Sequence, residues 1–170
     1  MNHRLKYFAL VLGTMVSLSV QAHSGHAHGS HSNMQHSTVD AATASAPDGV
    51  TISNCWIRAL PNRLPSAGYF QINNGGAHDA VLVNAQSSAF GKVMLHASKT
   101  VNGMAVMVHA DKVLVPAGER FEFAPNGHHV MLEQPTAELE IGKTLPITFW
   151  FEGERAVTAD CEVRSPASVK

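Results

Sequence analysis

Four residues near the middle of the chain carry side chains that would suit one soft metal ion. They follow the spacing H-x10-M-x21-H-x-M, and they are His96, Met107, His129 and Met131. Thioether sulfur is a soft neutral ligand and imidazole is borderline, whereas zinc normally draws thiolate or carboxylate, and calcium and magnesium draw oxygen. Two imidazoles and two thioethers therefore indicate a Cu(I) site.

Short apolar runs separated by turn residues predict the elements that carry these ligands. The runs are rich in Val, Ile, Leu and Phe, and Gly, Asn or Pro interrupts them where the chain must reverse. About nine short strands at this spacing predict an all-β sandwich or barrel. The expected strands are 50–57, 67–73, 80–86, 92–98, 104–109, 120–123, 128–133, 144–151 and 156–163.

The alternation of side chains along a strand bears on whether the four residues can meet. His129 and Met131 are two residues apart, so on a strand both side chains leave the same face. His96 precedes the turn at 102–103 and Met107 follows it, so their two strands are expected to pair as a hairpin that brings these residues close. The four ligands thus form two local pairs.

The other histidines and methionines of the folded part have simpler interpretations. A Met in a strand usually fills the core, and a lone His usually lies at the surface or in a hydrogen bond. His128 is expected to point away from the face of His129, and the spacing alone does not choose between these neighbours. The remaining residues in this class are Met94, Met104 and His109, with His78 as an exposed loop residue.

The first 22 residues predict export. A basic segment with Arg4 and Lys6 precedes an apolar run at 7–20, and Val20-Gln21-Ala22 fits a small-residue cleavage site. The run of about 14 residues is shorter than the roughly 20 needed to cross a bilayer as a helix, which favours a cleaved signal over a retained anchor. We expect cleavage after Ala22 and no stable membrane anchor.

Charge and length narrow the classes of protein. Without Arg4 and Lys6, 10 of the 12 basic residues remain against 13 acidic ones, a formal net charge of −3. This balance lacks the basic surface of a nucleic-acid-binding protein. The 148 residues that follow the signal suffice for one core, so we expect one domain at 49–165 and a short C-terminal tail at 166–170. We also expect the protein to be monomeric or weakly associating.

The two cysteines, Cys55 and Cys161, fall in the first and last expected strands. In an exported protein such a pair more often forms a disulfide than a metal site. A redox or copper-binding dithiol usually has the close spacing C-x-x-C, which this sequence lacks. We therefore expect a disulfide between Cys55 and Cys161.

The segment 23–48 is expected to be a flexible tail. It is rich in His, Ser, Ala and Gly, and it has too few large apolar residues to offset its chain entropy by burial. Histidine-rich tracts bind borderline metals, so a second hypothesis places Cu(II) or Zn(II) here; the alternative is a spacer with incidental histidines. The residues concerned are His23, His26, His28, His31 and His36.

The ligand spacing also carries a resemblance. A His or Met, ten residues, a Met, twenty-one residues and His-x-Met is the motif of the periplasmic copper chaperones called PCu(A)C, and it matches the four proposed ligands without gaps. Similarity extends over about 50–163, and includes Trp56-Ile57-Arg58-Ala59, Gly68-Tyr69, Pro116-Ala117-Gly118 and the segment 126–131. The chain resembles this family over its whole folded part.

The resemblance implies a cupredoxin-like Greek-key β-sandwich in the periplasm that binds Cu(I) through the four motif residues. It implies delivery, without catalysis, to a respiratory oxidase, typically to its binuclear copper centre, often alongside thiol-bearing copper proteins. It selects His129 over His128, because many members carry an aromatic residue at the latter position. Many members have Met where this chain has Ser98, and the tail and the cysteines are not family features.

Two other classes of function stay open as alternatives. A copper redox protein of the blue-copper type needs a Cys thiolate with two His near the end of the chain, and no His or Met follows Cys161. A metal-scavenging protein would bind metal mainly through the histidine-rich tail.

Overall fold

A computed structural model describes residues 40–41, 43–61 and 64–168. The expected signal and the five tail histidines lie outside these residues. The described part contains ten strands and one short 3-10 helix, Pro166–Ser168, within the expected C-terminal tail, and none of its helices is long and apolar enough to cross a membrane. The strands are β1 (Val50–Arg58), β2 (Ser66–Asn74), β3 (Ala80–Gln86), β4 (Phe90–Val101), β5 (Met104–His109), β6 (Val113–Val115), β7 (Arg120–Phe123), β8 (His128–Pro135), β9 (Thr144–Phe151) and β10 (Arg155–Arg164).

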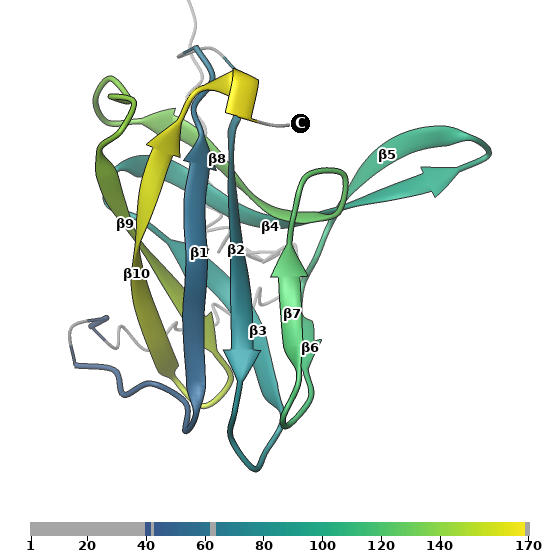
Figure 1. Cartoon of the computed structure of the whole chain (residues 1–170), viewed down its shortest axis with the longest axis vertical. Coiled ribbons are helices and arrows are strands. Elements are labelled where there is room, and N and C mark those ends of the chain that lie inside the picture. Colours follow the sequence, from purple (N-terminus) through teal and green to yellow (C-terminus); the bar gives the residue numbers. More distant parts are fainter. Residues whose placement is uncertain (1–39, 42, 62–63, 169–170) are drawn as a thin grey trace, which may run out of the picture. The chain divides into compact units, whose positions relative to one another are not determined.

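The strands form one hydrogen-bonded path in the order β5-β4-β8-β2-β1-β10-β9-β3-β6, with β7 also paired to β2. β1, β2, β7 and β10 lie in one layer and β3, β6 and β9 in the other, so the path folds over on itself (Figure 1). Several neighbours are far apart in sequence, such as β1 beside β10 and β8 beside β2, which is the crossing pattern of a Greek-key sandwich. The predicted all-β, cupredoxin-like sandwich is confirmed.

The two layers meet across an aromatic and aliphatic core. Phe70 of β2 contacts Phe149 of β9 and Phe123 of β7, and both pairs of ring centroids are 4.2 Å apart. These rings are almost completely buried, as are Ile57 and Leu132. Because side chains alternate along a strand, the residues next to the core residues must lie on the outer face.

All nine predicted strands are present, and the structure adds a tenth. β6 has three residues, Val113–Val115, and pairs with β3 through Ala80 and Val115. An apolar run of this length between Lys112 and Pro116 is too short to show an alternating pattern, so the sequence pattern does not predict this strand.

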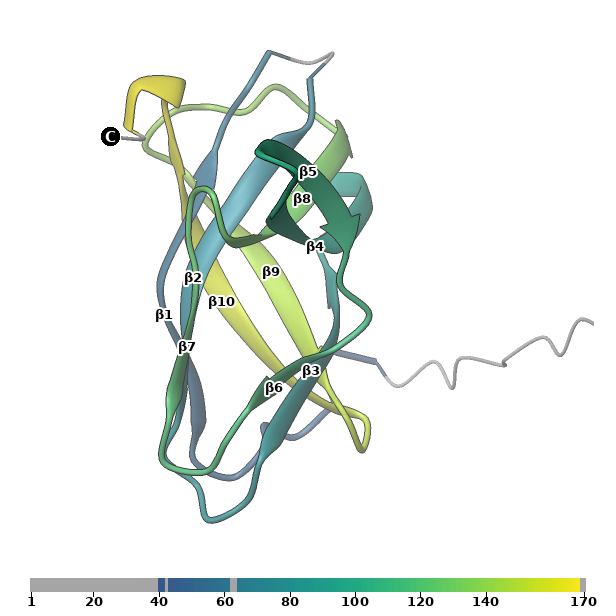
Figure 2. The same ribbon diagram turned by 90° about the vertical axis from the view of Figure 1, so that its right-hand side faces the viewer.

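A tight turn sets the pairing of β4 with β5. Asn102 and Gly103 have φ angles of 51° and 79°, the left-handed values that a two-residue type I′ hairpin turn requires. Val101 and Met104 close the hairpin, and the same register places His96 opposite His109. The hairpin reaches out beyond the other strands, and β5, β4 and β8 lie together in the second view (Figures 1 and 2).

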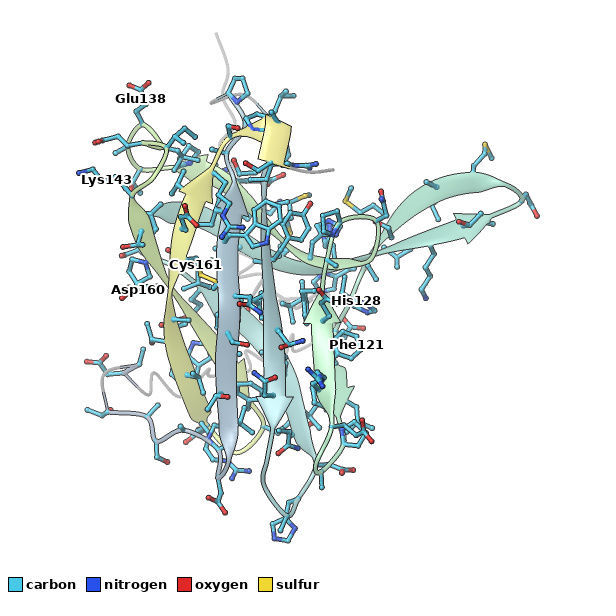
Figure 3. The ribbon with its side chains drawn as sticks, in the orientation of Figure 1. Phe121, His128, Glu138, Lys143, Asp160 and Cys161 are labelled. Atoms are coloured by element: carbon cyan, nitrogen blue, oxygen red, sulfur yellow. A yellow bond between two sulfur atoms is a disulfide. The ribbon has the colours of Figure 1, made fainter. Side chains whose placement is uncertain are left out.

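The neighbouring histidines of β8 point to opposite faces. Val130 and Leu132 are buried in the core, and His128 shares their face. Its ring lies 5.0 Å from the ring of Phe121 and 5.7 Å from that of Phe123, centroid to centroid (Figure 3). His129 therefore belongs to the outer face, whereas His128 packs as an aromatic residue at the edge of the core.

A disulfide joins the first strand to the last. Cys55 of β1 and Cys161 of β10 are bonded, with 4.5 Å between their Cα atoms, as predicted. They directly precede Trp56 and Glu162, the first pair of the parallel β1–β10 ladder. The bond thus links, within the fold, two strands through cysteines that are 106 residues apart in sequence.

Reduction of this disulfide is expected to lower the free energy of unfolding by about 2 to 5 kcal/mol, because the reduced unfolded chain regains the entropy of a long closed loop. Urea denaturation with and without a phosphine reductant measures the difference. The double variant Cys55→Ala/Cys161→Ala is the control and should not respond to reductant. Equal unfolding free energies for the oxidised and reduced wild type would contradict the stabilising role.

His128 is expected to weaken the apo fold in acid. Burial lowers the pKa of His128, and the nearby charges of His129 and Lys99 lower it further. Since the unfolded chain then binds the proton better, stability falls as the pH drops through the ordinary value of about 6.5 towards the lowered folded pKa. His128→Phe removes this loss, so its stability relative to wild type should be greater at about pH 5.5 than at about pH 7.5. Urea denaturation at both pH values tests this, and an equal difference at the two values would contradict it.

Candidate metal centre

β4 lies between β5 and β8, and its outer face gathers the imidazoles and thioethers of all three strands. His96 is opposite His129 on β8 and opposite His109 on β5. Met94 is opposite Met131, and Ser98 is opposite Met107. Directly paired residues of antiparallel strands share a face. The outer face therefore carries Met94, His96, Met107, His109, His129 and Met131.

The four residues of the motif thus reach one face from three adjacent strands. The ring centroids of His96 and His129 are 5.9 Å apart, and Met131 lies two residues from His129 on the same side of β8. Met107 lies two residues from His109, the residue directly opposite His96, so it is diagonal to His96 across the hairpin. A diagonal neighbour on a sheet is still within reach of a long side chain such as Met.

Hydrogen bonding leaves ring nitrogens of both central histidines free to bind metal. Nδ1 of His129 lies 3.1 Å from the carbonyl oxygen of Gly127, so Nδ1–H donates to that carbonyl and Nε2 keeps its lone pair. Nδ1 of His96 is buried and has no hydrogen-bond partner. A buried polar atom without a partner costs free energy, and coordination of a metal ion by His96 would offset that cost.

Electrostatics keep His96 in the form that binds metal. Burial lowers the pKa of His96, and the neighbouring imidazoles of His129 and His109 lower it further when they are charged. Only a neutral imidazole has a lone pair for a metal ion. The lowered pKa therefore favours the neutral, metal-binding form of His96.

Aromatic residues close one side of the site. Tyr69 is buried on β2 with its ring centroid 6.5 Å from that of His129, and Trp56 of β1 packs on Tyr69 at 4.6 Å. Burial raises the pKa of Tyr69, although Arg58 acts against this, so the phenol stays neutral. His129 itself is only 7% exposed, so its ring is held against this wall.

The opposite side of the site is open. β5 is the last strand of the hydrogen-bonded path, and Met107 on it is 58% exposed. Within the described residues, no three His, Cys, Asp or Glu side chains stand close enough to hold one ion, so in the present side-chain arrangement a site of four donors on this face includes methionine sulfur. The arrangement favours a soft ion over zinc or calcium.

The structure also locates the histidines and methionines that are outside the four-residue motif. Met104 is 67% exposed on the face of the hairpin opposite to Met107, and His78 lies in an exposed loop. Met94 and His109, however, lie beside the motif residues. Their parity was readable from the sequence, but the strand register that sets them opposite Met131 and His96 was not.

Comparison with known sequences finds two curated relatives. A putative lipoprotein of Leifsonia xyli subsp. xyli is 35% identical over 105 residues, which cover 61% of this chain and 63% of the relative. An uncharacterized protein of Rickettsia prowazekii is 32% identical over 88 residues, covering 51% of this chain and 49% of the relative. The matches thus span less than two thirds of the length of these relatives.

Comparison with solved structures finds the same fold. The copper-bound PCuAC domain from PmoF2 aligns with a TM-score of 0.59 and 24% identity, over 72% of this chain and 98% of that domain. The Cu(I) form of DR1885 from Deinococcus radiodurans aligns with a TM-score of 0.56 and 24% identity, over 71% of this chain and 81% of that protein. At this level of identity the likeness establishes a shared architecture.

Nearly the whole folded part of the chain matches one known family. Residues 50–163, from the first residue of β1 to the end region of β10, match the family described as putative lipoprotein LpqE-like. The matched region contains the outer face of β4, β5 and β8 with all its histidines and methionines. This chain belongs to the LpqE-like family.

Proposed function

We propose that this protein is a copper chaperone that binds one Cu(I) through His96, Met107, His129 and Met131 and passes it to a partner protein. The observation that carries the proposal is the register of β5, β4 and β8, which puts these two imidazoles and two thioethers on one outer face. Soft thioethers with imidazoles suit Cu(I), and the absence of thiolate from the set suits an oxidising compartment.

The open side of the site supports transfer. Met107 lies on the edge strand β5 and is exposed, so an incoming ligand of a partner would reach the metal there first. His129 is held by Gly127 and the aromatic wall, so it would release the metal last. Such stepwise ligand exchange moves the ion without making or breaking a covalent bond of a substrate, and we accordingly propose no enzymatic activity.

The proposed receiver is a copper-accepting subunit of a respiratory oxidase, typically its binuclear copper centre, with a thiol-bearing copper protein as a further partner. The support is the motif resemblance together with the shared fold, since two of the similar structures are described as copper-bound. The N-terminal sequence supports export to the periplasm after cleavage behind Ala22. We propose that the protein acts there as a monomer.

The disulfide argues against a blue-copper redox function, because it leaves no cysteine thiolate to bind copper. Both cysteines of the sequence are joined in the disulfide, and no free cysteine remains. A blue-copper centre needs a cysteine thiolate as ligand. The tail with its five histidines stays a separate hypothesis, as a collector of Cu(II) or Zn(II), and lies outside the described residues.

Cu(I) competition titrations test the folded site. Met107→Ser and Met131→Ser are each expected to lower Cu(I) affinity by at least about tenfold. Mutation of a residue that only hydrogen-bonds to a metal ligand typically lowers metal affinity about 10- to 100-fold, and loss of a ligand itself should cost no less. Met104→Ser is the matched control, since Met104 is exposed on the same hairpin but on its other face. Ascorbate as the reductant leaves the disulfide intact. Equal affinities in all four proteins would show that the methionines are not ligands.

Deletion of residues 24–36 separates the folded site from the tail. If the folded domain holds Cu(I), the deletion is expected to leave Cu(I) affinity unchanged within about twofold, because histidine-rich tracts favour borderline ions. The same competition titration measures this. A loss of Cu(I) affinity upon deletion would instead assign binding to the tail and support a scavenging role.

A further inference from the structure

We propose that the same face carries a second, harder set of ligands, which binds Cu(II) through His96, His109 and His129 with Asp111 beside them. The proposal rests on the proposed Cu(I) site, because the two sets share His96 and His129. It starts from one observation that the ligand spacing did not contain: the hairpin register sets His109 directly opposite His96.

The three rings are spaced for chelation in pairs. The ring centroid of His96 lies 5.8 Å from that of His109 and 5.9 Å from that of His129, in edge-on arrangements of 89° and 77°. Two imidazoles on one ion, each with a metal–nitrogen distance of about 2 Å, have centroids roughly 5 to 6 Å apart. Each cross-strand pair therefore matches the span of a two-imidazole chelate.

A carboxylate accompanies the outermost imidazole. Nε2 of His109 lies 3.5 Å from Oδ1 of Asp111, and both side chains are largely exposed. Carboxylate oxygen is a hard ligand and imidazole a borderline one, and both suit Cu(II) better than thioether does. His109 and Asp111 thus add one borderline and one hard donor at the open side of the site, where an ion would arrive from solvent.

The three rings lie in a row across β8, β4 and β5, and one movement gathers them. In the described part of the chain, no three His, Cys, Asp or Glu side chains are already close enough together to hold one ion. His96 is partly buried and His129 is held by its bond to Gly127, whereas the side chain of His109 is 56% exposed. Rotamer changes of exposed side chains are fast, so His109 is the ligand that turns inward.

The two sets share His96 and His129; the Cu(I) set adds the thioethers of Met107 and Met131, and the Cu(II) set adds His109 with Asp111. Met107 and His109 are two residues apart on this strand and share a face, and the first offers soft sulfur while the second offers nitrogen. Because both sets need His96 and His129, one ion at a time occupies the face. The oxidation state of the arriving copper then selects which β5 residue completes the site, and no electron transfer is part of the proposal.

The test uses the whole chain with the five tail histidines replaced by Asn, which removes the competing tail without shortening the protein. His109→Asn in this background is compared with His78→Asn, a matched change in an exposed loop. Cu(II) affinity is measured without reductant against a chelator of known affinity, and Cu(I) affinity with ascorbate. Amide NMR spectra at substoichiometric Cu(II) locate the ion, because a paramagnetic ion broadens nearby signals.

His109→Asn is expected to lower Cu(II) affinity by at least about tenfold, while Cu(I) affinity changes by less than about twofold. Broadening should be confined to amides of β4, β5 and β8 in the parent and should disappear from β5 in the variant. Asp111→Asn should weaken Cu(II) binding to a smaller extent. His78→Asn should match the parent in every measurement.

Two results would overturn the proposal. Unchanged Cu(II) affinity in His109→Asn would remove His109 from the ligands, and an equal loss of Cu(I) and Cu(II) affinity would mean that one set serves both ions. Failure of the proposed chaperone site is a different result, namely Cu(I) affinity that is insensitive to Met107→Ser and Met131→Ser. The Cu(II) measurements on His109 variants are independent of that outcome.

Discussion

The proposed metal-binding face depends on the hydrogen-bonded register of β4 with its two neighbours, β5 and β8. Side chains alternate with a period of two, so a slip of one residue would turn His96 into the core and bring Leu95 out to solvent. Burial of Leu95 and Val130 opposes that slip from the inside, and the left-handed Asn102-Gly103 turn opposes it at the hairpin. The positions of the proposed ligands follow from these constraints rather than from any contact among those side chains themselves.

The fold combines a rigid side and an open side at this face. His129 is backed by Tyr69 and tied to Gly127, and the disulfide joins the strands β1 and β10 beyond that wall. On the other side, the edge strand β5 exposes Met107 and His109. A protein that must hold an ion and also release it needs this difference, because a fully enclosed site would block the entry of a partner's ligand.

Nδ1 of His96 is buried without a hydrogen-bond partner, and this favours the binding of a metal ion. Its burial lowers the pKa and keeps the ring neutral, and it leaves a nitrogen whose lost hydration no protein group replaces. A metal ion would satisfy that nitrogen. His128 has a similarly lowered pKa but faces Phe121 and Phe123, so its burial serves packing at the expense of stability in acid. These two histidines, on the neighbouring strands β4 and β8, thus differ because His96 faces the proposed metal site and His128 faces the core.

Much of the fold and part of the site could be predicted from local sequence patterns. Alternating apolar runs and turn residues located nine strands, and the Asn102-Gly103 dipeptide predicted the hairpin, because both signals arise from neighbouring residues. Two cysteines without a close spacing predicted their disulfide. β6 was missed because a run of three residues carries no period.

The sequence by itself determined the donor types, the parity of His129 and Met131, and the pairing of Cys55 with Cys161. The tertiary structure decided which strands lie beside β4 and in what register, because pairing between strands distant in sequence depends on the packing of the whole core. That register placed His109 opposite His96 and Met94 opposite Met131. The motif therefore contains four possible metal ligands, and the assembled sheet places six on one face.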